Sequence, residues 1–196
     1  MLPPAVHTSD IAVERALHER RSIRQYQNET LTLAELSQLL WAAQGITHPS
    51  GLRTAPSAGA LYPLELYVVV GNVAELTAGV YRYRPQTHDL ILIAAGDKRP
   101  LLSQAALAQD AVREAAAVLV LAAVYERTTV KYGERGIRYV HIEVGAAAQN
   151  VSLQAVSLEL GTVYIGAFHD EQVKQVLTLR AEEQPLCLLP VGRPRP

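Results

Sequence analysis

The spacing of apolar residues along the chain marks out helices and strands before any other property is considered. In the segment 32–45 apolar residues recur at the three- and four-residue spacing of one helix face, at Leu36, Leu39, Leu40 and Ala43. A capping-box sequence, Thr-Leu-Ala-Glu, opens this segment at Thr32, and Gly45 ends it. We therefore predict an amphipathic helix here, followed by a long loop rich in Gly, Pro and Ser from Ile46 to Pro63.

Unbroken apolar runs and a hairpin pattern predict the strands. We expect strands at 64–70, 80–83, 90–93, 115–124, 163–165 and 186–191, with the second and third joined as an antiparallel hairpin by the turn 85–89. The alanine-rich run 115–124 leaves a helix open as the alternative. Helices are predicted from Ser9 or Asp10 to about Arg21 and over 100–109, 137–160 and 171–177.

The longest predicted helix, which Gly161 would close, is unusually apolar. From Ile142 onward its only charged residues are Glu143 and Glu159. Such a helix must be buried, either in the core of its own domain or against a partner subunit. The mixture of helices and strands, with a hairpin that requires antiparallel pairing, predicts an α+β fold with a mixed sheet.

Composition places the chain among folded globular proteins. Of its 196 residues 49% are hydrophobic and 19% charged, so we expect one domain over residues 1–196. The formal net charge of −1 argues against a general nucleic-acid binder or a polybasic membrane binder. Fifteen of the 18 basic residues are arginine, whose planar fork binds phosphates and carboxylates bidentately. Any anion must therefore be bound by a local group of arginines.

The single cysteine, Cys187, excludes an internal disulfide and a multi-cysteine metal site. Its apolar neighbours predict a buried, unreactive thiol, and the histidines show no spacing typical of metal ligands. The N-terminus lacks the basic and apolar regions of a secretion signal, and the longest apolar run is shorter than the roughly 20 residues that cross a bilayer. We expect a cytoplasmic protein with no metal, membrane or nucleic-acid partner.

Two arginine-containing segments are candidate phosphate sites. Arg20, Arg21, Ser22 and Arg24 lie within five residues and offer three guanidinium groups and a hydroxyl, more donors than one carboxylate can use. A basic helix end exposed to solvent explains the same residues. Arg193, in a Pro-Val-Gly-Arg-Pro segment near the chain end, is a further phosphate candidate.

Two segments of small residues could let a flat ligand approach the backbone closely. These are Pro56-Ser57-Ala58-Gly59, before the first strand, and Ile165-Gly166-Ala167, after a later one. Neither is a Walker A loop or a dinucleotide fingerprint, and an ordinary connection explains each equally well. Lys131 and Tyr132, which precede the long helix with its Gln149, are residue types that transfer protons, although such a pair is also common on surfaces.

Taken together and in order, five segments resemble the nitroreductase-like FMN-dependent oxidoreductase superfamily, and within it the SagB-type dehydrogenase branch. The segments are RRSIRQY at 20–26, PSAGALYPLELYVV at 56–69, TTVKYGERGIRYVHIEVGAAAQN at 128–150, YIGAF at 164–168 and LLPVGRP at 188–194. The resemblance implies a nitroreductase-like fold with a mixed, mainly antiparallel sheet flanked by helices. It also implies an intertwined homodimer with two FMN sites at the subunit interface, which would give the long apolar helix a partner.

The resemblance also implies roles for individual residues. Arg20, Arg21, Ser22 and Arg24 match a flavin-binding segment that contacts the ribityl chain and phosphate, and Arg193 matches a further phosphate contact. The segment 56–59 matches residues that lie against the flavin ring, while 165–167 matches the backbone near its N5 atom, and Gln149 belongs to the matching helix. Two positions depart from the pattern, with Ala60 in place of an Asn and Ala146 in place of a His.

The function that the resemblance implies is hydride transfer between FMN and either NADH, NADPH or a small organic substrate. In azole-forming members of the branch, a pair matching Lys131 and Tyr132 is implicated in removing a proton from a peptide substrate. A nitroreductase or quinone reductase and an azoline dehydrogenase are therefore both open. The alternatives are a non-catalytic flavin-binding subunit of a peptide-modifying complex and an interaction domain without a ligand.

Overall fold

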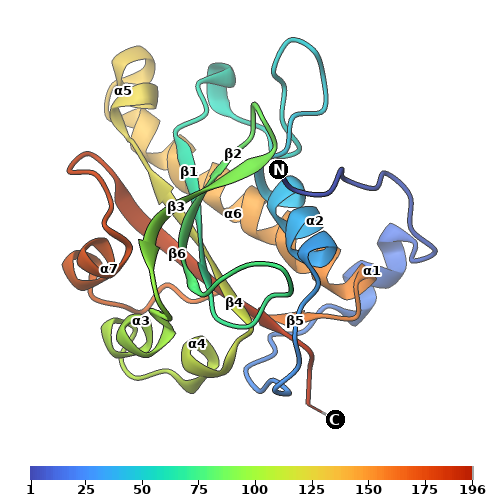
Figure 1. The fold of residues 1–196 in the computed structure, drawn as a ribbon. Coiled ribbons are helices and arrows are strands. Elements are labelled where there is room, and N and C mark those ends of the chain that lie inside the picture. The colour runs from blue at the N-terminus through green and yellow to red at the C-terminus, as the bar shows by residue number, and fades with distance from the viewer. Residues whose placement is uncertain (196) are drawn as a thin grey trace.

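The computed structural model describes residues 1–195, which are built around one six-stranded sheet (Figure 1). The strands lie in the order β3-β2-β1-β4-β6-β5, and every ladder between neighbours is antiparallel. Parallel pairing within this range is confined to isolated bridges, such as that of Ser22 with Thr162. The strands are β1 (Leu64–Val70), β2 (Gly79–Arg84), β3 (Asp89–Ala95), β4 (Ala117–Ala123), β5 (Gly161–Thr162) and β6 (Gln184–Gly192).

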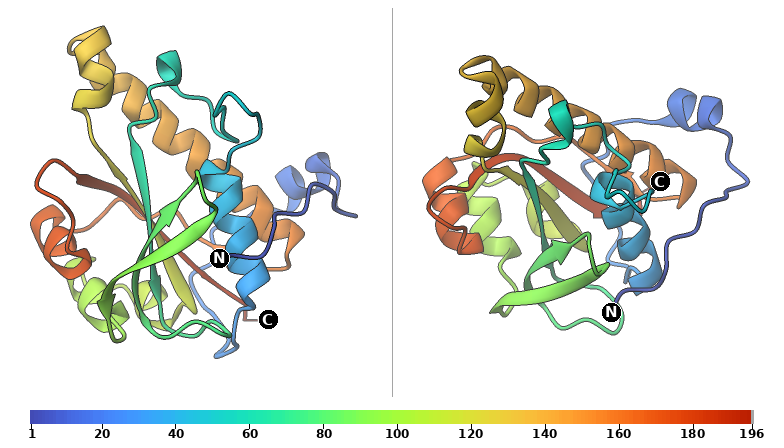
Figure 2. Two further views of the ribbon diagram at one scale, coloured as in Figure 1. Left: turned by 45° about the horizontal axis from the view of Figure 1, so that its top comes forward. Right: turned by 90° about the horizontal axis from the view of Figure 1, so that it is seen from above.

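Helices cover both faces of the sheet, which makes three layers (Figure 2). The helices α2 and α6 pack on one face and α3, α4 and α7 on the other, while α1 lies outside α6 and α5 leads into it. Their bounds are α1 (Val13–Glu19), α2 (Leu33–Gln44), α3 (Arg99–Ala105), α4 (Asp110–Glu114), α5 (Glu126–Tyr132), α6 (Arg135–Ser157) and α7 (Asp170–Leu177). A short 3-10 turn, η1 (Ala58–Ala60), lies in the loop before β1.

Strand β1 shows why an unbroken apolar run forms a strand in this fold. Successive side chains of a strand point to opposite faces of the sheet. Leu66 and Val68 join the core under α2 and α6, whereas Tyr67 and Val69 join the core under α3, α4 and α7. Because both faces are covered, both sets of positions from Leu66 to Val70 are apolar and buried, and the predicted strand at 64–70 is confirmed.

The predicted capping box at the start of α2 is also confirmed. Thr32 Oγ1 accepts a hydrogen bond from the backbone nitrogen of Glu35 at 3.1 Å, and the Glu35 carboxylate accepts one from the nitrogen of Thr32 at 2.8 Å. The helix ends before Gly45, where a Cβ atom would lie 2.1 Å from the ring of Trp41. Both ends of α2 therefore follow from local sequence.

Two predicted helices differ from the structure. The first begins at Val13 without a side-chain cap, because Ser9 Oγ instead accepts from the nitrogen of Ile11 in a turn. It ends at Glu19, which leaves Arg20 and Arg21 outside the helix. The predicted helix at 100–109 ends early, at Ala105, because the backbone takes positive φ values at Leu107 and Ala108, and the short helix α4 that follows at Asp110 was not predicted.

The boundary between α6 and β5 was also predicted wrongly. Gly161 does not close the helix, which ends at Ser157, but is the first residue of β5 and pairs with Gly192. The predicted strand at 163–165 therefore lies two residues too late. A Cβ atom on Gly161 would lie 2.7 Å from Ile23, so glycine is needed here for close approach rather than for a helix cap. The short helix α5 was also not predicted.

Candidate functional site

The loop 56–59 meets the pair Lys131 and Tyr132 at the end of α5. Gly59, within η1, has a φ of 65°, in the left-handed region that favours glycine. A Cβ atom built on Gly59 would lie 2.8 Å from Tyr132 Oη and 3.0 Å from Lys131 Nζ. Two groups that can carry protons therefore lie directly over the backbone of Gly59, and two predicted segments distant in sequence are brought together.

The two side chains over Gly59 are held differently. The ring of Tyr132 stands edge-on against Tyr139 of α6, with the ring centroids 5.1 Å apart and the planes at 85°. Lys131 is exposed, and its ammonium lies 5.4 Å from the centroid of the Tyr132 ring. The phenol is thus fixed by packing, whereas the lysine stem is free to reorient toward a bound molecule.

A buried polar cluster formed by Gln44, Arg53, Ser57 and Glu143 adjoins the same loop. Arg53 Nη1 donates to Gln44 Oε1 at 2.6 Å, and its guanidinium lies 4.2 Å from the centroid of the Tyr62 ring. The nitrogen of Tyr62 donates to Ser57 Oγ at 2.9 Å, which leaves the Ser57 hydroxyl free to donate to Glu143. The cluster therefore links the end of α2, the loop and α6.

Glu143 is the titratable group of this cluster. It is only 3% exposed, and this burial raises the pKa of its carboxyl to about 7, against the opposing effects of the Ser57 hydroxyl and the Arg53 charge. Its Oε1 atom has no hydrogen-bond partner among the described residues, and neither do Gln44 Nε2 and Arg53 Nε. The sequence analysis did not select Glu143, although a lone carboxyl in an otherwise apolar part of a helix is the signal that could have identified it.

The segment 20–24 lies beside β5, at the other end of α6. The nitrogen of Ile23 donates to the carbonyl oxygen of Thr162 at 2.9 Å. Arg21 Nη1 donates to the carbonyl oxygens of His18 and Arg20, so this guanidinium caps the end of α1. The side chains of Arg20 and Arg24 have no hydrogen bond or ion pair with any described residue, and Ser22 is exposed. Two of the three predicted phosphate-binding guanidinium groups are therefore available.

Arg193 is engaged within its own chain. Its Nη1 donates to the carbonyl oxygen of Leu158 at 2.9 Å, just after α6, and its Nη2 pairs with Glu35 at the start of α2. A second carboxylate, that of Glu29, lies 3.9 Å away. The guanidinium thus ties two helix ends together, and its predicted contact with a phosphate stays a prediction.

The segment 165–167 lies along the outer edge of β6. Ile165 is buried and exchanges two backbone hydrogen bonds of 2.9 Å with Leu188, whereas Gly166 and Ala167 are exposed. A Cβ atom built on Gly166 would meet nothing within 4 Å. This stretch of backbone is therefore open to a ligand.

Two groups of predicted site residues lie at opposite ends of α6. The segment 56–59 and the pair Lys131 and Tyr132 lie near its first turns, whereas 20–24 and Arg193 lie beyond its last turn (Figure 1). A helix of 23 residues is about 34 Å long. Gln149 lies between the groups and is exposed. A single chain therefore does not bring all the predicted residues to one place.

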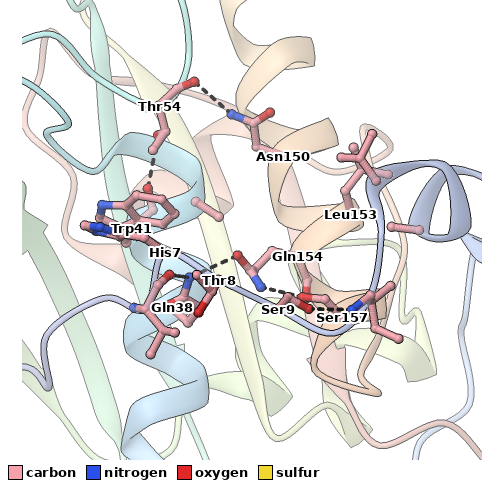
Figure 3. Close-up of a pocket in the computed structure, with 15 residues that line it drawn as sticks. His7, Thr8, Ser9, Gln38, Trp41, Thr54, Asn150, Leu153, Gln154 and Ser157 are labelled. Carbon is pink, nitrogen blue, oxygen red and sulfur yellow. Dashed lines mark hydrogen bonds between the residues drawn. The ribbon is translucent and has the colours of Figure 1, made fainter.

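A separate cavity of about 290 Å³ lies between the N-terminal segment, α2 and α6 (Figure 3). His7 stacks on Trp41 with ring centroids 5.3 Å apart, and Gln38 bonds to both backbone polar atoms of Val6 and to Gln154. No predicted site residue lines this cavity, and these contacts secure the N-terminal segment against the two helices.

The remaining predictions concern the cysteine, metal ligands and membrane-spanning helices. Cys187 is fully buried, as predicted, and burial raises the pKa of its thiol to about 12. Across residues 1–195 no group of three or more His, Cys, Asp or Glu side chains is placed to hold a metal ion. None of the helices in this range has the length and apolar character needed to cross a membrane.

Comparison with known proteins gives the family. The model of the Nitroreductase family matches residues 17–193. The chain is 50% identical over 184 residues to a Methanocaldococcus jannaschii protein named as a nitroreductase, covering 94% of this chain and 92% of that protein. It is 28% identical over 155 residues to the microcin B17-processing protein McbC of Escherichia coli, covering 76% of this chain and 57% of McbC.

The solved structures agree with the fold. A crystal structure from Anabaena variabilis, titled as a nitroreductase, superposes with a TM-score of 0.84 at 34% sequence identity. The match covers 93% of this chain but 38% of that one, so the chain spans well under two thirds of the length of some of its relatives. The matched range and the shared fold together show that the chain belongs to the nitroreductase family.

Proposed function

We propose that the protein is an FMN-dependent oxidoreductase that works as a homodimer and takes NADH or NADPH as electron donor. FMN, when bound, accepts or donates a hydride at the N5 atom of its ring. The residues present fit this cofactor, because the guanidinium groups of Arg20 and Arg24 are unpaired and can bind its phosphate. The exposed backbone at Gly166, with open space where a side chain would stand, fits the approach of a flat ring.

The observation that carries the proposal is the separation of the two residue groups along α6. In a symmetric dimer with the two α6 helices antiparallel, the first turns of one helix lie beside the last turns of the other. One subunit would then supply the loop 56–59 and Tyr132, while its partner supplied the arginines of segment 20–24. Each of the two sites would be complete only in the dimer.

The uncovered face of α6 supports this arrangement. Ile142 is 62% exposed and Ile137 is 43% exposed, and a Cβ atom on Gly145 would meet nothing within 4 Å. Val130 on the preceding helix is 87% exposed. Apolar side chains around a position without a side chain form a surface against which a second helix can pack closely.

Each residue near the loop then has a task. Tyr132 Oη and Lys131 Nζ are positioned to exchange a proton with a substrate that lies over Gly59. Ser57 is held by its bond to Tyr62 and by Glu143, so it can present a fixed hydroxyl at the same place. The unpaired arginines of segment 20–24 would supply positive charge to the opposite part of the site.

A peptide is the second candidate substrate. Two observations favour it, namely the similarity to a microcin-processing protein and the placement of Lys131 and Tyr132 over an exposed backbone. In this variant of the proposal the lysine and tyrosine remove a proton from the peptide as it is oxidised.

The experiment is to purify the protein, record its absorbance and reduce it with NADH, NADPH or dithionite. We expect a yellow protein with about one FMN per subunit that elutes as a dimer. Lys131→Ala should keep reduction by the pyridine nucleotide and lose peptide oxidation, and Lys174→Ala on α7 is the matched control. A colourless protein that takes up no added FMN would contradict the proposal, and bound FMN that dithionite reduces but neither NADH nor NADPH does would indicate a non-catalytic subunit.

A further inference from the structure

A fork in the sheet opens a second cavity. The ladder between β1 and β2 pairs residues only from Tyr67 with Arg82 to Val70 with Gly79. The first residues of β1 remain paired with β4, and the last residues of β2 remain paired with β3. The two strands therefore diverge beyond Tyr67, and a cavity of about 390 Å³ lies where they separate.

The cavity is rich in arginine. Five of its lining residues are arginines and one is a carboxylate, namely Arg53, Arg82, Arg84, Arg127, Arg180 and Glu65. A hollow surrounded by like charges is electrostatically unfavourable unless carboxylates or a bound anion compensate them.

The carboxylates of the protein compensate three of the five charges. Arg84 pairs with Asp89 beside it. Arg127 and Arg180 share Glu65, and Arg180 also binds the buried carboxylate of Glu183 and lies 3.4 Å from Glu182.

The other two charges, those of Arg53 and Arg82, are not compensated in this way. Arg82 has no hydrogen bond or ion pair among residues 1–195. Arg53 has no ion pair in this range either, and of the two carboxyls that act on it, Glu143 and Glu65, the second is already shared by Arg127 and Arg180. An excess of positive charge therefore remains at the fork.

Buried donors without acceptors point to the same conclusion. Gln44 is 1% exposed and lines the cavity, yet its Nε2 atom has no hydrogen-bond partner. The Nε atom of Arg53, also in the lining, is buried and unpartnered as well. Both atoms are donors, and an unsatisfied buried donor is costly, so the polar contacts behind the lining are incomplete as they stand.

We propose that the fork between β1 and β2 binds a small multivalent oxyanion, either a phosphate compound or a di- or tricarboxylate. Such a group carries several acceptor oxygens, enough to bind the Arg82 guanidinium together with other arginines of the lining. The cavity volume lies within the range of small-molecule sites, roughly 300 to 1,000 Å³. The site shares Gln44 and Arg53 with the polar cluster beside the loop 56–59, but it includes neither Lys131 and Tyr132 nor segment 20–24, and it does not depend on FMN.

The fork is connected to the loop before β1. Arg127 Nη1 donates to the carbonyl oxygen of Tyr62 at 3.0 Å, and Arg53 lies over the ring of the same tyrosine. Since the nitrogen of Tyr62 holds Ser57, an anion that orders Arg53 and Arg127 also orders the backbone next to the candidate active site.

The test is calorimetric titration of the full-length protein with pyrophosphate and, separately, with citrate at constant ionic strength. We expect saturable binding of one or both, and the responding ligand distinguishes the phosphate class from the carboxylate class. Arg82→Gln should weaken binding by about tenfold or more, as expected for loss of a charged hydrogen bond, and leave FMN content unchanged. Arg113→Gln, an exposed arginine on α4 paired with Asp110, is the matched control.

Two further variants make the result decisive. Arg24→Gln should lower FMN retention and leave pyrophosphate or citrate binding unchanged, because it belongs to the other site. If Arg82→Gln does not fold, Arg82→Lys keeps the charge but loses the fork geometry, and its weaker binding supports the proposal. The proposal is overturned if neither pyrophosphate nor citrate binds saturably, or if the Arg82 variants bind the anion as tightly as wild type. It is also overturned if Arg24→Gln alone loses anion binding.

Discussion

Replacing Glu143 by glutamine should remove a pH-dependent loss of stability. The carboxyl is buried at 3% exposure between Ser57 and Arg53, and its pKa is raised to about 7 because burial disfavours the charged form. Glutamine has nearly the same shape and can still accept the Ser57 hydrogen, but it is neutral at every pH. The substitution therefore isolates the cost of the buried charge.

The direction and size follow from the two protonation states. In the unfolded chain a glutamate loses its proton near pH 4.5, whereas in the folded protein this one loses it near pH 7. Between these values the folded state holds the additional proton, so the free energy of unfolding falls as the pH rises. The shift from 4.5 to about 7, at about 1.4 kcal/mol per pH unit, corresponds to about 3 kcal/mol once the pH is well above 7.

Urea unfolding of wild type and Glu143→Gln at several values between about pH 5 and about pH 8 measures this difference. The two proteins should have similar free energies of unfolding near pH 5, and the variant should be more stable by up to about 3 kcal/mol near pH 8. Glu134→Gln, which changes an exposed glutamate at the start of α6, should follow the wild-type profile. Parallel profiles for wild type and Glu143→Gln would refute the assignment of the raised pKa to this carboxyl.

Three other substitutions test the remaining geometry. Gly59→Ala should cost about 1 kcal/mol of stability in denaturant unfolding, since its φ is positive, and should displace the side chain of Tyr132, which a crystal structure of the variant would show. Arg193→Ala should lower the free energy of unfolding by about 2 to 4 kcal/mol, because it removes hydrogen bonds that tie α6 to α2 and leaves a partly buried carboxylate unpaired, and denaturant unfolding measures this. Arg24→Ala should raise the FMN dissociation constant at least about tenfold in a fluorescence titration, whereas Arg113→Ala should leave it unchanged.

Most of the sheet could be predicted because its strands are apolar on both faces. Layers of helix on either side leave no solvent-exposed position in β1 or β4, so a simple run of apolar residues was a sufficient signal. Helix ends were predictable where the cap is local, as at Thr32, and not where the backbone is shaped by distant contacts. Gly161 illustrates the second case, because its reason for being glycine is the side chain of Ile23, which no local pattern reveals.

The candidate site, too, could be predicted from the sequence only in part. Lys131 and the arginines of segment 20–24 could be selected as candidates because the charge of these side chains can be recognised within a single short segment of sequence. Their separation along α6 was not predictable, since it depends on where the chain crosses the sheet. Glu143 and the unpaired Arg82 stand out only through what surrounds them, burial in one case and the lack of a carboxylate in the other.

The place of β6 in the sheet has a consequence for how the protein can be synthesised. This last strand of the chain lies between β4 and β5, so neither neighbour can complete its pairing until the ribosome has released residues 184–192. Until then β4, whose seven residues are all buried in the native fold, presents an open apolar edge, the kind of surface that pairs with other chains. Folding of this domain during translation must therefore wait for residues 184–192, and a truncation before residue 184 should yield aggregates rather than a smaller folded protein.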